Sequence, residues 1–267
     1  MKKISISMLI WIILCIVTIC AIAYVSGTFF LAKTAKIVHP EVTFELENYG
    51  TIKIELYPEH APNTVANFIK LAQAGYYNDK IIYGKDELCL YVGRNVDGEP
   101  VMPRISLITE TIEPDSELDY DYEIPGEFMV NGFNNKLRHE KGVISLIRSD
   151  YTTQLSNLVS ESYNSGSAQI GIMMGESKNL DGYYAAFGRI VDGLDILERI
   201  NSDLEIEPPE EDENGEEVES AIQVFAEKPV IKNVTVETYG VNYGMPIVNK
   251  AFDYMAYLYE LLSQYEY

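Results

Sequence analysis

Residue types that commonly carry chemistry are few in this sequence. The chain has 267 residues, with three cysteines and three histidines. Cys15 and Cys20 lie in an apolar run near the N-terminus, so Cys89 is the sole thiol of the remaining chain. A single thiol cannot form an internal disulfide, and no spacing of cysteine or histidine matches a metal site. We therefore interpret Cys89 as a small buried apolar residue and predict no metal site.

The densest group of charged side chains is an acidic stretch at residues 203–220, DLEIEPPEEDENGEEVES. Asp212, Asn214 and Glu217 offer the oxygen ligands that calcium prefers, but their spacing is not that of an EF-hand loop. A run of like charges is usually solvated. The sequence therefore predicts an exposed acidic loop inserted into the domain.

The charge balance of the whole chain is strongly acidic. It contains 41 Asp and Glu against 20 Lys and Arg, which gives a formal charge of −21 at pH 7. Nucleic-acid binding needs a basic surface for the phosphates, so the composition excludes nucleic acid as a partner. An acidic body also avoids anionic membrane surfaces unless a tether holds it there.

The N-terminus has the composition of such a tether. Lys2 and Lys3 precede an apolar run that carries no charge until Lys33. About 20 apolar residues cross a bilayer core, whereas the apolar region of a cleaved signal peptide has about 7–15. We predict one transmembrane helix in an anchor at residues 1–32, embedded through residues 4–25 and followed by a linker at residues 33–40.

Two features of this segment leave alternatives open. Ala21 and Ala23 form an A-x-A pattern, so a cleaved signal peptide is the competing interpretation. Lys33 and Lys36 balance the two N-terminal lysines, so the positive-inside rule gives little bias. A short N-terminal tail before a lone anchor usually stays inside. We therefore predict a single-pass protein of the cell membrane whose C-terminal domain is extracytoplasmic.

The elements that must position any site are mostly strands. Apolar residues alternate with polar ones over residues 42–46 and again over residues 52–56, on either side of Asn48-Tyr49-Gly50. This pattern predicts a β-hairpin with one buried face. Further strands are predicted at residues 88–93, 104–109, 142–147, 168–174, 183–191 and 230–240. Residues 149–167 are polar and long for a loop.

Helical spacing occurs in three places. Val65, Phe68, Ile69 and Ala72 fall at i, i+3, i+4 and i+7, with Asn63 or Thr64 as the N-cap and Gly75 at the C-terminal end. A shorter helix is predicted at residues 193–200. Residues 241–267 are predicted to form an amphipathic helix that packs on the domain rather than binding a partner. Mostly strands with few helices favour a closed antiparallel barrel with helices over its ends.

Four segments then resemble one family, the cyclophilins, which are peptidyl-prolyl cis-trans isomerases. They are GTIKIELYPEHAPNTVANFIKLAQAGYYND, GEFMVNGFNNKLRHEKGVISL, LDGYYAAFGRIVDGLDILERI and KPVIKNVTV, and they occur in the family's order across residues 42–239. The resemblance implies a mainly β fold at residues 41–240, a closed eight-stranded antiparallel barrel capped by two helices. It also implies that the partners are proline-containing polypeptide segments and that no cofactor is needed.

The family's chemistry is rotation about an X-Pro amide. Resonance opposes this rotation with a barrier of about 18–20 kcal/mol, and uncatalysed exchange is slow. In the transition state the proline nitrogen gains a free lone pair, and in this family an arginine donates a hydrogen bond to it. Such a donor acts selectively on the twisted form and therefore lowers the barrier.

The resemblance also assigns positions to the site. By these matches, the peptide-binding residues are Gln169, Leu180, Tyr184, Ile147 and Leu90. When the segment is aligned without gaps from Tyr77, the family's catalytic arginine becomes Gly84, and its pocket phenylalanine becomes Cys89. A shift of this alignment would bring Lys85 or Arg94 to the vacant place, and Arg148 stands on the wall that grips the peptide. The candidate replacement donors are therefore Arg148, Arg94 and Lys85.

Three interpretations of function remain. The first is a membrane-tethered prolyl isomerase that helps extracytoplasmic proteins to fold, with a competence that depends on a replacement donor. The second is a catalytically inactive relative that binds peptides or a membrane-protein partner. The third is a scaffold in a membrane complex, with the acidic loop and the tyrosine-rich tail as contact surfaces.

Overall fold

The fold is taken from a computed structural model that describes residues 11, 13–24, 37–209, 217–218 and 220–264. The chain divides into two compact units, Met1–Val38 and His39–Tyr267. In the first unit residues 11 and 13–24 are helical, and the rest of the predicted anchor lies outside the described residues. Among the helices of the described residues, none combines the length and the apolar character needed to cross a membrane.

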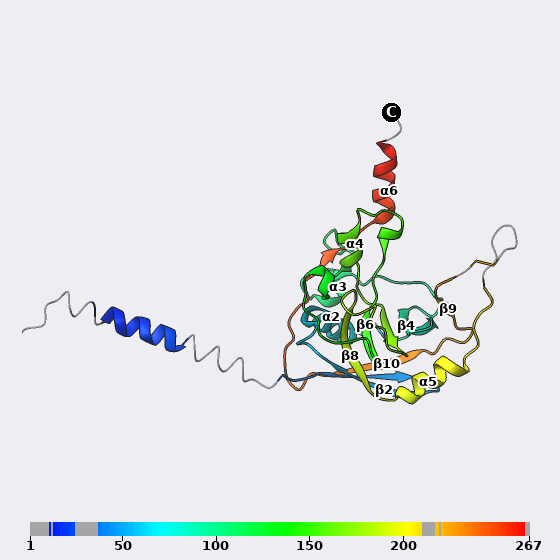
Figure 1. Cartoon of the computed structure of the whole chain (residues 1–267), viewed down its shortest axis with the longest axis horizontal. Helices are drawn as coiled ribbons and strands as arrows, with labels where there is room; N and C mark the ends of the chain where they lie inside the picture. Colours follow the sequence, from blue (N-terminus) through cyan, green and yellow to red (C-terminus); the bar gives the residue numbers. More distant parts are fainter. Residues whose placement is uncertain (1–10, 12, 25–36, 210–216, 219, 265–267) are drawn as a thin grey trace, which may run out of the picture. The chain divides into compact units, whose positions relative to one another are not determined.

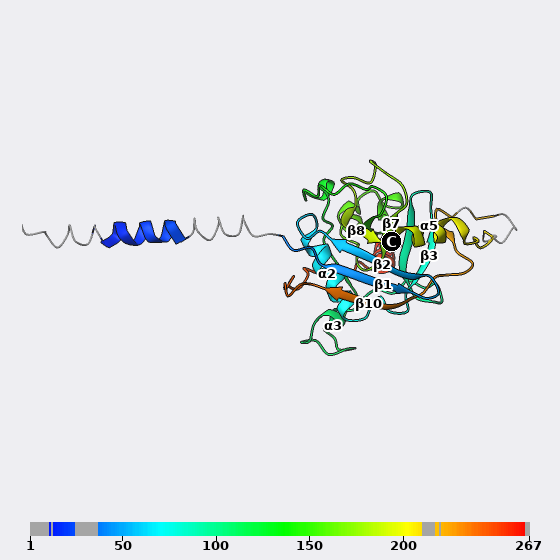
Figure 2. The same cartoon turned by 90° about the horizontal axis from the view of Figure 1, so that it is seen from below.

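The second unit is built on one curled antiparallel sheet (Figures 1 and 2). Its order is β10–β1–β2–β8–β6–β7–β4–β3–β9. The strands are β1 (Glu41–Leu46), β2 (Gly50–Leu56), β3 (Ile81–Lys85), β4 (Cys89–Arg94), β6 (Val143–Leu146), β7 (Ile170–Met173), β8 (Ala185–Asp192), β9 (Gln223–Val224) and β10 (Ile231–Glu237). Near the two ends of the sheet, Ile81 and Val230 form an isolated antiparallel bridge. The mainly β prediction is confirmed, but the described sheet has nine strands rather than the eight expected of a barrel.

The predicted first hairpin is confirmed. β1 and β2 pair in a continuous antiparallel register from Glu41–Glu55 to Leu46–Gly50. Val42, Phe44 and Leu46 are buried, as the alternation requires. Asn48 and Gly50 have φ values of 64° and 113°, so the turn uses residue types that tolerate a left-handed backbone.

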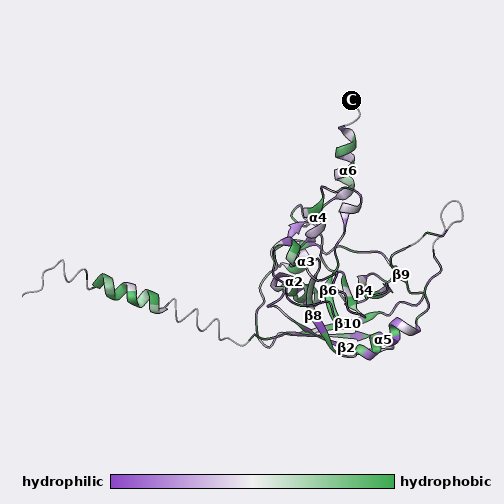
Figure 3. Ribbon diagram, in the orientation of Figure 1, coloured by the Kyte–Doolittle hydropathy of each residue, from purple (hydrophilic) through white to green (hydrophobic). Residues whose placement is uncertain are grey.

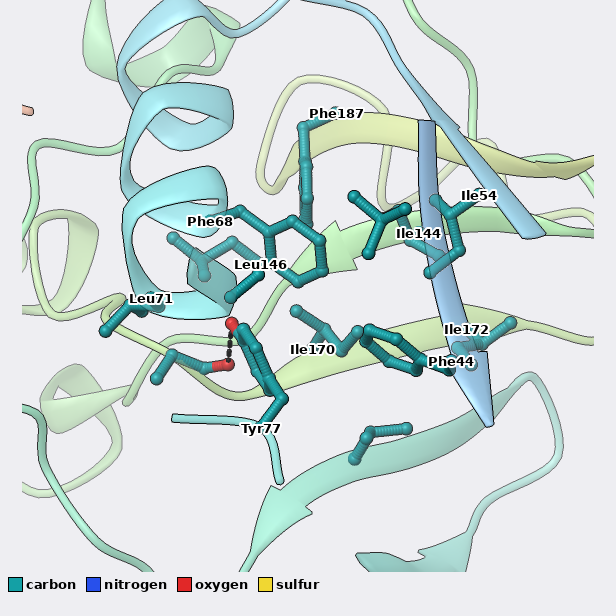
Figure 4. Packing of buried hydrophobic residues seen from close by; sticks show 14 of the residues in the cluster. Phe44, Ile54, Phe68, Leu71, Tyr77, Ile144, Leu146, Ile170, Ile172 and Phe187 are labelled. Atoms are coloured by element: carbon teal, nitrogen blue, oxygen red, sulfur yellow. Dashed lines mark hydrogen bonds between the residues drawn. The ribbon is translucent and has the colours of Figure 1, made fainter. Parts of the chain in front are cut away.

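Helix α2 (Pro62–Gln73) packs its apolar face on the sheet. The Phe68 ring lies 4.9 Å from the ring of Tyr77 and 5.2 Å from that of Phe187. Figure 4 shows these rings against isoleucine and leucine side chains of β6 and β7. Burial of one such phenylalanine contributes about 1.5–3 kcal/mol to folding.

The predicted N-cap of α2 is wrong. Ala61 is the N-cap residue and provides no side-chain hydrogen bond. Instead, the buried Glu127 carboxylate accepts hydrogen bonds from the backbone N–H groups of Asn63 and Thr64, at 2.9 and 2.7 Å. A carboxylate 63 residues away therefore satisfies the helix start, which no local pattern reveals. At the other end Gly75 has φ +76°, as predicted.

Residues 104–109 form no strand, contrary to the prediction. They contain the short helix α3 (Ile105–Ile108). The buried Asp119 carboxylate accepts hydrogen bonds from Ser106 N at 3.0 Å and from Arg104 Nε at 2.8 Å. These bonds satisfy the start of a helical turn, and they override the strand-like composition of the segment.

The remaining elements lie around this core. The long polar segment at 149–167 contains η2 (Tyr151–Thr153) and α4 (Val159–Tyr163), and α5 (Leu194–Asp203) confirms the predicted short helix. β5 (Tyr122–Glu123) pairs with β11 (Asn249–Lys250). The short helix η1 (Met129–Asn131) ends in a left-handed Gly132.

The C-terminal prediction is wrong in two respects. Helix α6 (Tyr254–Ser263) is shorter than the predicted segment of 241–267, and it has no buried residue. Met255, Tyr259 and Leu262 are 57%, 69% and 61% exposed. Figure 3 shows apolar residues along this helix, which projects from the domain. The helical spacing of apolar residues therefore predicted that a helix forms here, but it did not predict that the helix stays exposed.

Candidate functional site

Of the residues assigned by the family resemblance, Leu90 lies on β4 and Gln169 directly precedes β7, while Tyr184 directly precedes β8 and contacts Arg148. The strands β4 and β7 are neighbours in the sheet. These strands pair antiparallel, with Cys89 opposite Met173 and Leu90 opposite Ile172. Leu90 is fully buried in the main core, so its side chain lies beneath the surface of the sheet. Cys89 belongs to a second buried cluster with Val143, Met173 and Ala186, and Leu137, Leu180 and Tyr91 pack against that cluster. As expected for a buried thiol, burial raises the pKa of Cys89 to about 12.

Gly84, which occupies the family's arginine position, lies against β9, the strand that follows the acidic loop at 203–220. We refer to this loop and β9 together as the insertion. Gly84 pairs with Val224 of β9, and Lys85 pairs with Gln223. A Cβ atom at position 84 would lie 2.5 Å from the carbonyl oxygen of Gln223 and 3.0 Å from Ile222 Cγ2. The backbone of β9 therefore fills the space that a side chain at position 84 would need, which explains why this residue is a glycine.

A basic side chain nevertheless reaches the neighbourhood of Gln169. The Arg94 guanidinium carbon lies 4.2 Å from the centre of the Tyr83 ring. The Tyr83 hydroxyl in turn donates a hydrogen bond to Gln169 Oε1 at 3.1 Å. Arg94 comes from the end of β4, not from β3 where the family places its arginine. Of the three candidate donors, Arg94 is the one that these contacts link to Gln169.

The guanidinium of Arg94 has unused donor capacity. Its Nη1 donates to the Gly98 carbonyl at a long 3.4 Å. Its Nε is the one buried side-chain nitrogen or oxygen without a hydrogen-bond partner in the part of the chain that the structure describes. Next to it Gly93 has φ +118°, and a Cβ atom there would lie 3.2 Å from Gln169 Cα. The glycine thus lets β4 approach the Gln169 backbone closely.

Tyr83 and Tyr91 form an aromatic pair on adjacent strands. Their ring centres are 6.0 Å apart, and the Tyr91 hydroxyl donates to Asp86 Oδ2 at 2.7 Å. The second Asp86 oxygen accepts from the backbone N–H groups of Leu88 and Cys89. Burial raises the pKa of Tyr83, and the neighbouring positive charge of Arg94 opposes that rise. Tyr83 is therefore a neutral hydroxyl at physiological pH.

Arg148 is held among aromatic rings on another part of the surface. Its guanidinium carbon lies 4.7 Å from the ring centre of Tyr184 and 5.2 Å from that of Tyr163. Its Nε donates to Tyr183 O and its Nη1 to Ser149 O, both at 3.2 Å. The bond to Tyr183 O and the ring contact with Tyr184 tie the loop after β6 to the segment that carries the predicted peptide-binding residue Tyr184.

Lys85 is also committed to other groups. Its Nζ donates to the carbonyl oxygen of Asn201 near the C-terminal end of α5, at 2.5 Å. It also lies 5.9 Å from the centre of the Phe225 ring. A cation near the last turn of a helix interacts favourably with the helix dipole, so Lys85 has a structural explanation.

Ile147 lies between the residues around Gln169 and the residues around Arg148. Its backbone N–H donates to Gln169 O at 2.9 Å. A Cβ atom at Gly171 would lie 3.0 Å from Ile147 Cδ1 and 3.7 Å from Cys89 Sγ. The glycine therefore leaves room for Ile147 and Cys89 to form a small apolar surface beside Gln169.

His139, Asp181 and Ser145 have the spacing of a nucleophilic triad. His139 Nδ1 lies 3.0 Å from Asp181 Oδ1, and His139 Nε2 lies 3.0 Å from Ser145 Oγ. However, His139 is 1% exposed and Ser145 is 4% exposed, so no substrate can reach the hydroxyl. Burial lowers the pKa of His139, which stays neutral and holds the Leu180–Gly182 turn to β6.

The acidic insertion forms a cavity next to Arg94. The cavity has a volume of about 1010 Å³ and is lined by Arg94 and by residues 206–209, 217–218 and 220–224. Of the calcium-type residues noted in the sequence, Asp212 and Asn214 lie outside the described residues. No group of three or more His, Cys, Asp or Glu side chains among the described residues could hold a metal.

Comparison with known proteins relates this chain to one family. A family model described as "Cyclophilin type peptidyl-prolyl cis-trans isomerase/CLD" matches residues 41–237. Peptidyl-prolyl cis-trans isomerase-like 2 of Rhizopus delemar is 29% identical over 184 residues, 68% of this chain but 28% of that protein. Peptidyl-prolyl cis-trans isomerase-like 3 of Gallus gallus is 27% identical over 152 residues, 57% of this chain and 76% of that protein.

Solved structures of one relative were also found. A crystal structure of a cyclophilin type peptidyl-prolyl cis-trans isomerase of Cryptosporidium parvum has a TM-score of 0.49 and 17% identity, over 74% of this chain and 98% of that chain. A second structure of that protein was determined in the presence of the dipeptide Ala-Pro, with a TM-score of 0.49 and 18% identity.

Proposed function

Because the chain belongs to the cyclophilin-type peptidyl-prolyl cis-trans isomerase family, we propose that it binds X-Pro segments of polypeptides and catalyses rotation about the prolyl bond. One observation carries the catalytic part of this proposal. Arg94, which is only partly buried, stacks on Tyr83, whose hydroxyl is bonded to Gln169, and its Nη1 makes one long hydrogen bond, to Gly98 O at 3.4 Å. A cationic N–H donor is therefore present near the matched peptide-binding residue, although position 84 is a glycine.

In this proposal the work of the site is electrostatic. As the prolyl amide twists, its nitrogen becomes a hydrogen-bond acceptor, and the guanidinium of Arg94 donates to it. Because this bond exists in the twisted state and not in the planar state, it lowers the barrier rather than only tightening binding. A preorganised donor of this kind typically contributes about 10²–10³ in rate.

The remaining assigned residues would bind the peptide. Gln169 would hydrogen-bond its backbone, while Ile147 and Leu180 would contact the proline ring at the edge of the apolar cluster around Cys89. Tyr184, held by Arg148, would form the wall. Leu90 would support the floor from the core, since its side chain is buried. Compared with the family pattern, this pocket offers less aromatic surface to a proline ring, so we expect short peptides to bind weakly.

The location of the activity is a separate part of the proposal. We place the domain outside the cytoplasm on a membrane anchor in residues 1–32, so that its substrates would be proteins folding there. The support is the apolar run after Lys3 and the exposed apolar side chains of residues 13–24. Mass spectrometry of the protein from the membrane fraction tests this, because a signal peptidase cut after Ala23 would give a chain that begins at Tyr24.

A second function is favoured by the altered pocket. With Gly84 in place of an arginine and Cys89 in place of an aromatic residue, a domain that binds proline peptides or a membrane protein without rotating the bond is the alternative. A scaffold role would use the acidic insertion and the exposed α6 as contact surfaces.

An isomerisation assay of the full chain in detergent distinguishes these functions. We expect acceleration of cis-to-trans exchange of an Ala-Pro peptide, lowered about 10²–10³-fold in kcat by Arg94→Ala. Gln169→Ala should mainly raise KM, and Arg189→Ala, which removes a half-buried arginine on β8 that pairs with Glu140, should change neither constant. If the wild-type rate equals the uncatalysed rate while the peptide still binds, the inactive binding domain is the correct function. Loss of activity in Arg148→Ala, with Arg94→Ala active, would transfer the donor role to Arg148.

A further inference from the structure

The side chain that holds Arg94 in place is Tyr83. Resting on the proposed function, we infer that Tyr83 is the positioning residue of the site and couples the donor Arg94 to the peptide-binding Gln169. The family resemblance assigns no role to this position, and the inference comes from the contacts of the Tyr83 ring and hydroxyl.

The first contact is a stack of the guanidinium on the ring. The distance of 4.2 Å from Arg94 Cζ to the ring centre is well within the range of about 6 Å for a cation–π interaction. A planar guanidinium can stack on an aromatic face while its N–H groups remain free to donate in its own plane. The stack therefore fixes the plane of the guanidinium without consuming its N–H donors.

The second contact joins this platform to the peptide-binding residue. The Tyr83 hydroxyl donates to Gln169 Oε1 at 3.1 Å, which leaves the Gln169 amide NH₂ able to donate to a peptide carbonyl. One side chain thus touches both polar groups of the site. A shift of Tyr83 would move Arg94 and Gln169 relative to each other.

Tyr83 is itself immobilised, as a positioning residue must be. It is 2% exposed and lies on β3 between β4 and β9. Next to it, Gly84 pairs with Val224 of the insertion, and on the β4 side the Tyr91 ring packs at 6.0 Å. Tyr91 is in turn held by its bond to Asp86. The insertion that closes off position 84 therefore also supports the platform for the new donor.

Without Tyr83, little would hold the Arg94 side chain. Its remaining hydrogen bond in the described structure is the long contact from Nη1 to Gly98 O at 3.4 Å. Arginine has many rotamers, and a donor that samples them loses the preorganisation on which its catalytic effect depends. Loss of Tyr83 should therefore lower kcat more than it raises KM.

The test compares two substitutions of Tyr83 in the full chain in detergent. Tyr83→Phe keeps the ring and removes the hydroxyl, whereas Tyr83→Leu removes both. We expect Tyr83→Leu to lower kcat about 10–100-fold with a change in KM below about threefold, and Tyr83→Phe to stay within about fivefold of wild type in kcat. Tyr239→Phe, which changes an exposed tyrosine in the turn after β10, is the matched control and should behave as wild type.

A second readout does not depend on activity. Because the guanidinium lies on the ring, the NMR signal of Arg94 Hε should show an upfield ring-current shift in the wild type and in Tyr83→Phe, and should lose it in Tyr83→Leu. Circular dichroism establishes whether each variant is folded. If Tyr83→Leu does not fold, the kcat and the ring-current shift of Tyr83→Phe still test the inference.

The outcomes separate the two proposals. Two results would overturn the positioning role. One is a wild-type kcat in a folded Tyr83→Leu variant. The other is an equal loss of kcat in Tyr83→Phe and Tyr83→Leu, with the ring-current shift of Arg94 retained in Tyr83→Phe. An additive loss in the double variant Tyr83→Leu/Arg94→Ala would do the same, since a residue that acts through Arg94 should add nothing once the Arg94 guanidinium is gone. If the wild type does not accelerate exchange at all, the proposed catalysis fails, and the NMR shift alone decides whether Tyr83 holds Arg94.

Discussion

At the scale of single residues, the site shows how a position can lose its side chain for a steric reason. The sequence pattern identifies Gly84 as a departure from the family, and the contacts of β9 explain it, because Gln223 O occupies the space for a Cβ atom. The same pattern gave Arg94 as one of three possible donors but could not choose among them. It missed Tyr83, since a tyrosine carries no signal of a cation stacked on its ring.

The crowding at position 84 leads to a stability prediction. Gly84→Ala should destabilise the domain by about 1–3 kcal/mol, because the new methyl group would push the β9 backbone away from β3. Urea unfolding followed by circular dichroism measures this loss. Gly175→Ala is the matched control, since a Cβ atom there meets only Leu88 Cδ2 at an ordinary 3.5 Å. Equal stabilities of the two variants would contradict the account of β9, and Gly84→Arg should fail to raise activity for the same steric reason.

At the scale of elements, the local sequence pattern predicted a helix or strand correctly where its apolar residues are buried in the structure. Hairpin β1–β2 and helix α2 were predicted because alternation and helical spacing both point to one apolar face. The segment at 104–109 and the start of α2 could not be predicted, because the carboxylates that satisfy them, Asp119 and Glu127, lie outside the local sequence window, 13 and 63 residues away. Helix α6 has apolar residues at helical spacing, and Tyr254 stacks on Tyr151, but none of the helix residues is buried, so the pattern predicted its presence and not the extent of its packing.

The C-terminal segment is docked by a buried acid, which makes its attachment pH-dependent. Glu123 on β5 is 6% exposed, and its Oε2 accepts from Phe252 N at 3.2 Å. Burial raises the pKa of Glu123 to about 7, and the bond from Phe252 opposes that rise only in part. Because the pKa is about 4.5 in the unfolded chain, the folded state is favoured below pH 4.5. It loses stability as pH rises to about 7, by at most about 3 kcal/mol.

Substitution of this acid tests the linkage. Glu123→Gln keeps an oxygen acceptor for Phe252 N and removes the charge, so the free energy of unfolding should no longer fall between pH 5 and about 7.5. Denaturant titrations of the wild type and of Glu123→Gln at several pH values measure how the free energy of unfolding of each protein depends on pH. Other groups around the site, Asp121, Lys250, Asp253 and Tyr151, are present in both proteins and cancel in the difference. Parallel pH profiles would show that Glu123 does not set the docking.

At the scale of the whole molecule, the fold is that of its family, and the acidity is a property of this chain. The family match spans residues 41–237, and the insertion with β9 lies inside it. A chain with a formal net charge of −21 creates a negative potential over its surface, which concentrates cationic ligands and repels anionic ones. The acidic residues Glu207 and Glu217 line the cavity beside Arg94, so this field extends to the proposed groove.

The field predicts a charge preference among substrates that salt removes. Two peptides with one Ala-Pro bond each, one flanked by lysines and the other by glutamates, should differ in affinity for the full chain. At about 0.02 M salt, where the Debye length is over 20 Å, the lysine peptide should bind at least about tenfold more tightly. At about 0.5 M salt the Debye length falls to about 4 Å, and the ratio should approach one. Fluorescence anisotropy of labelled peptides measures both values without relying on catalysis. A ratio that stays constant across this range would mean that contacts within the groove, and not the charge of the molecule, select the peptide.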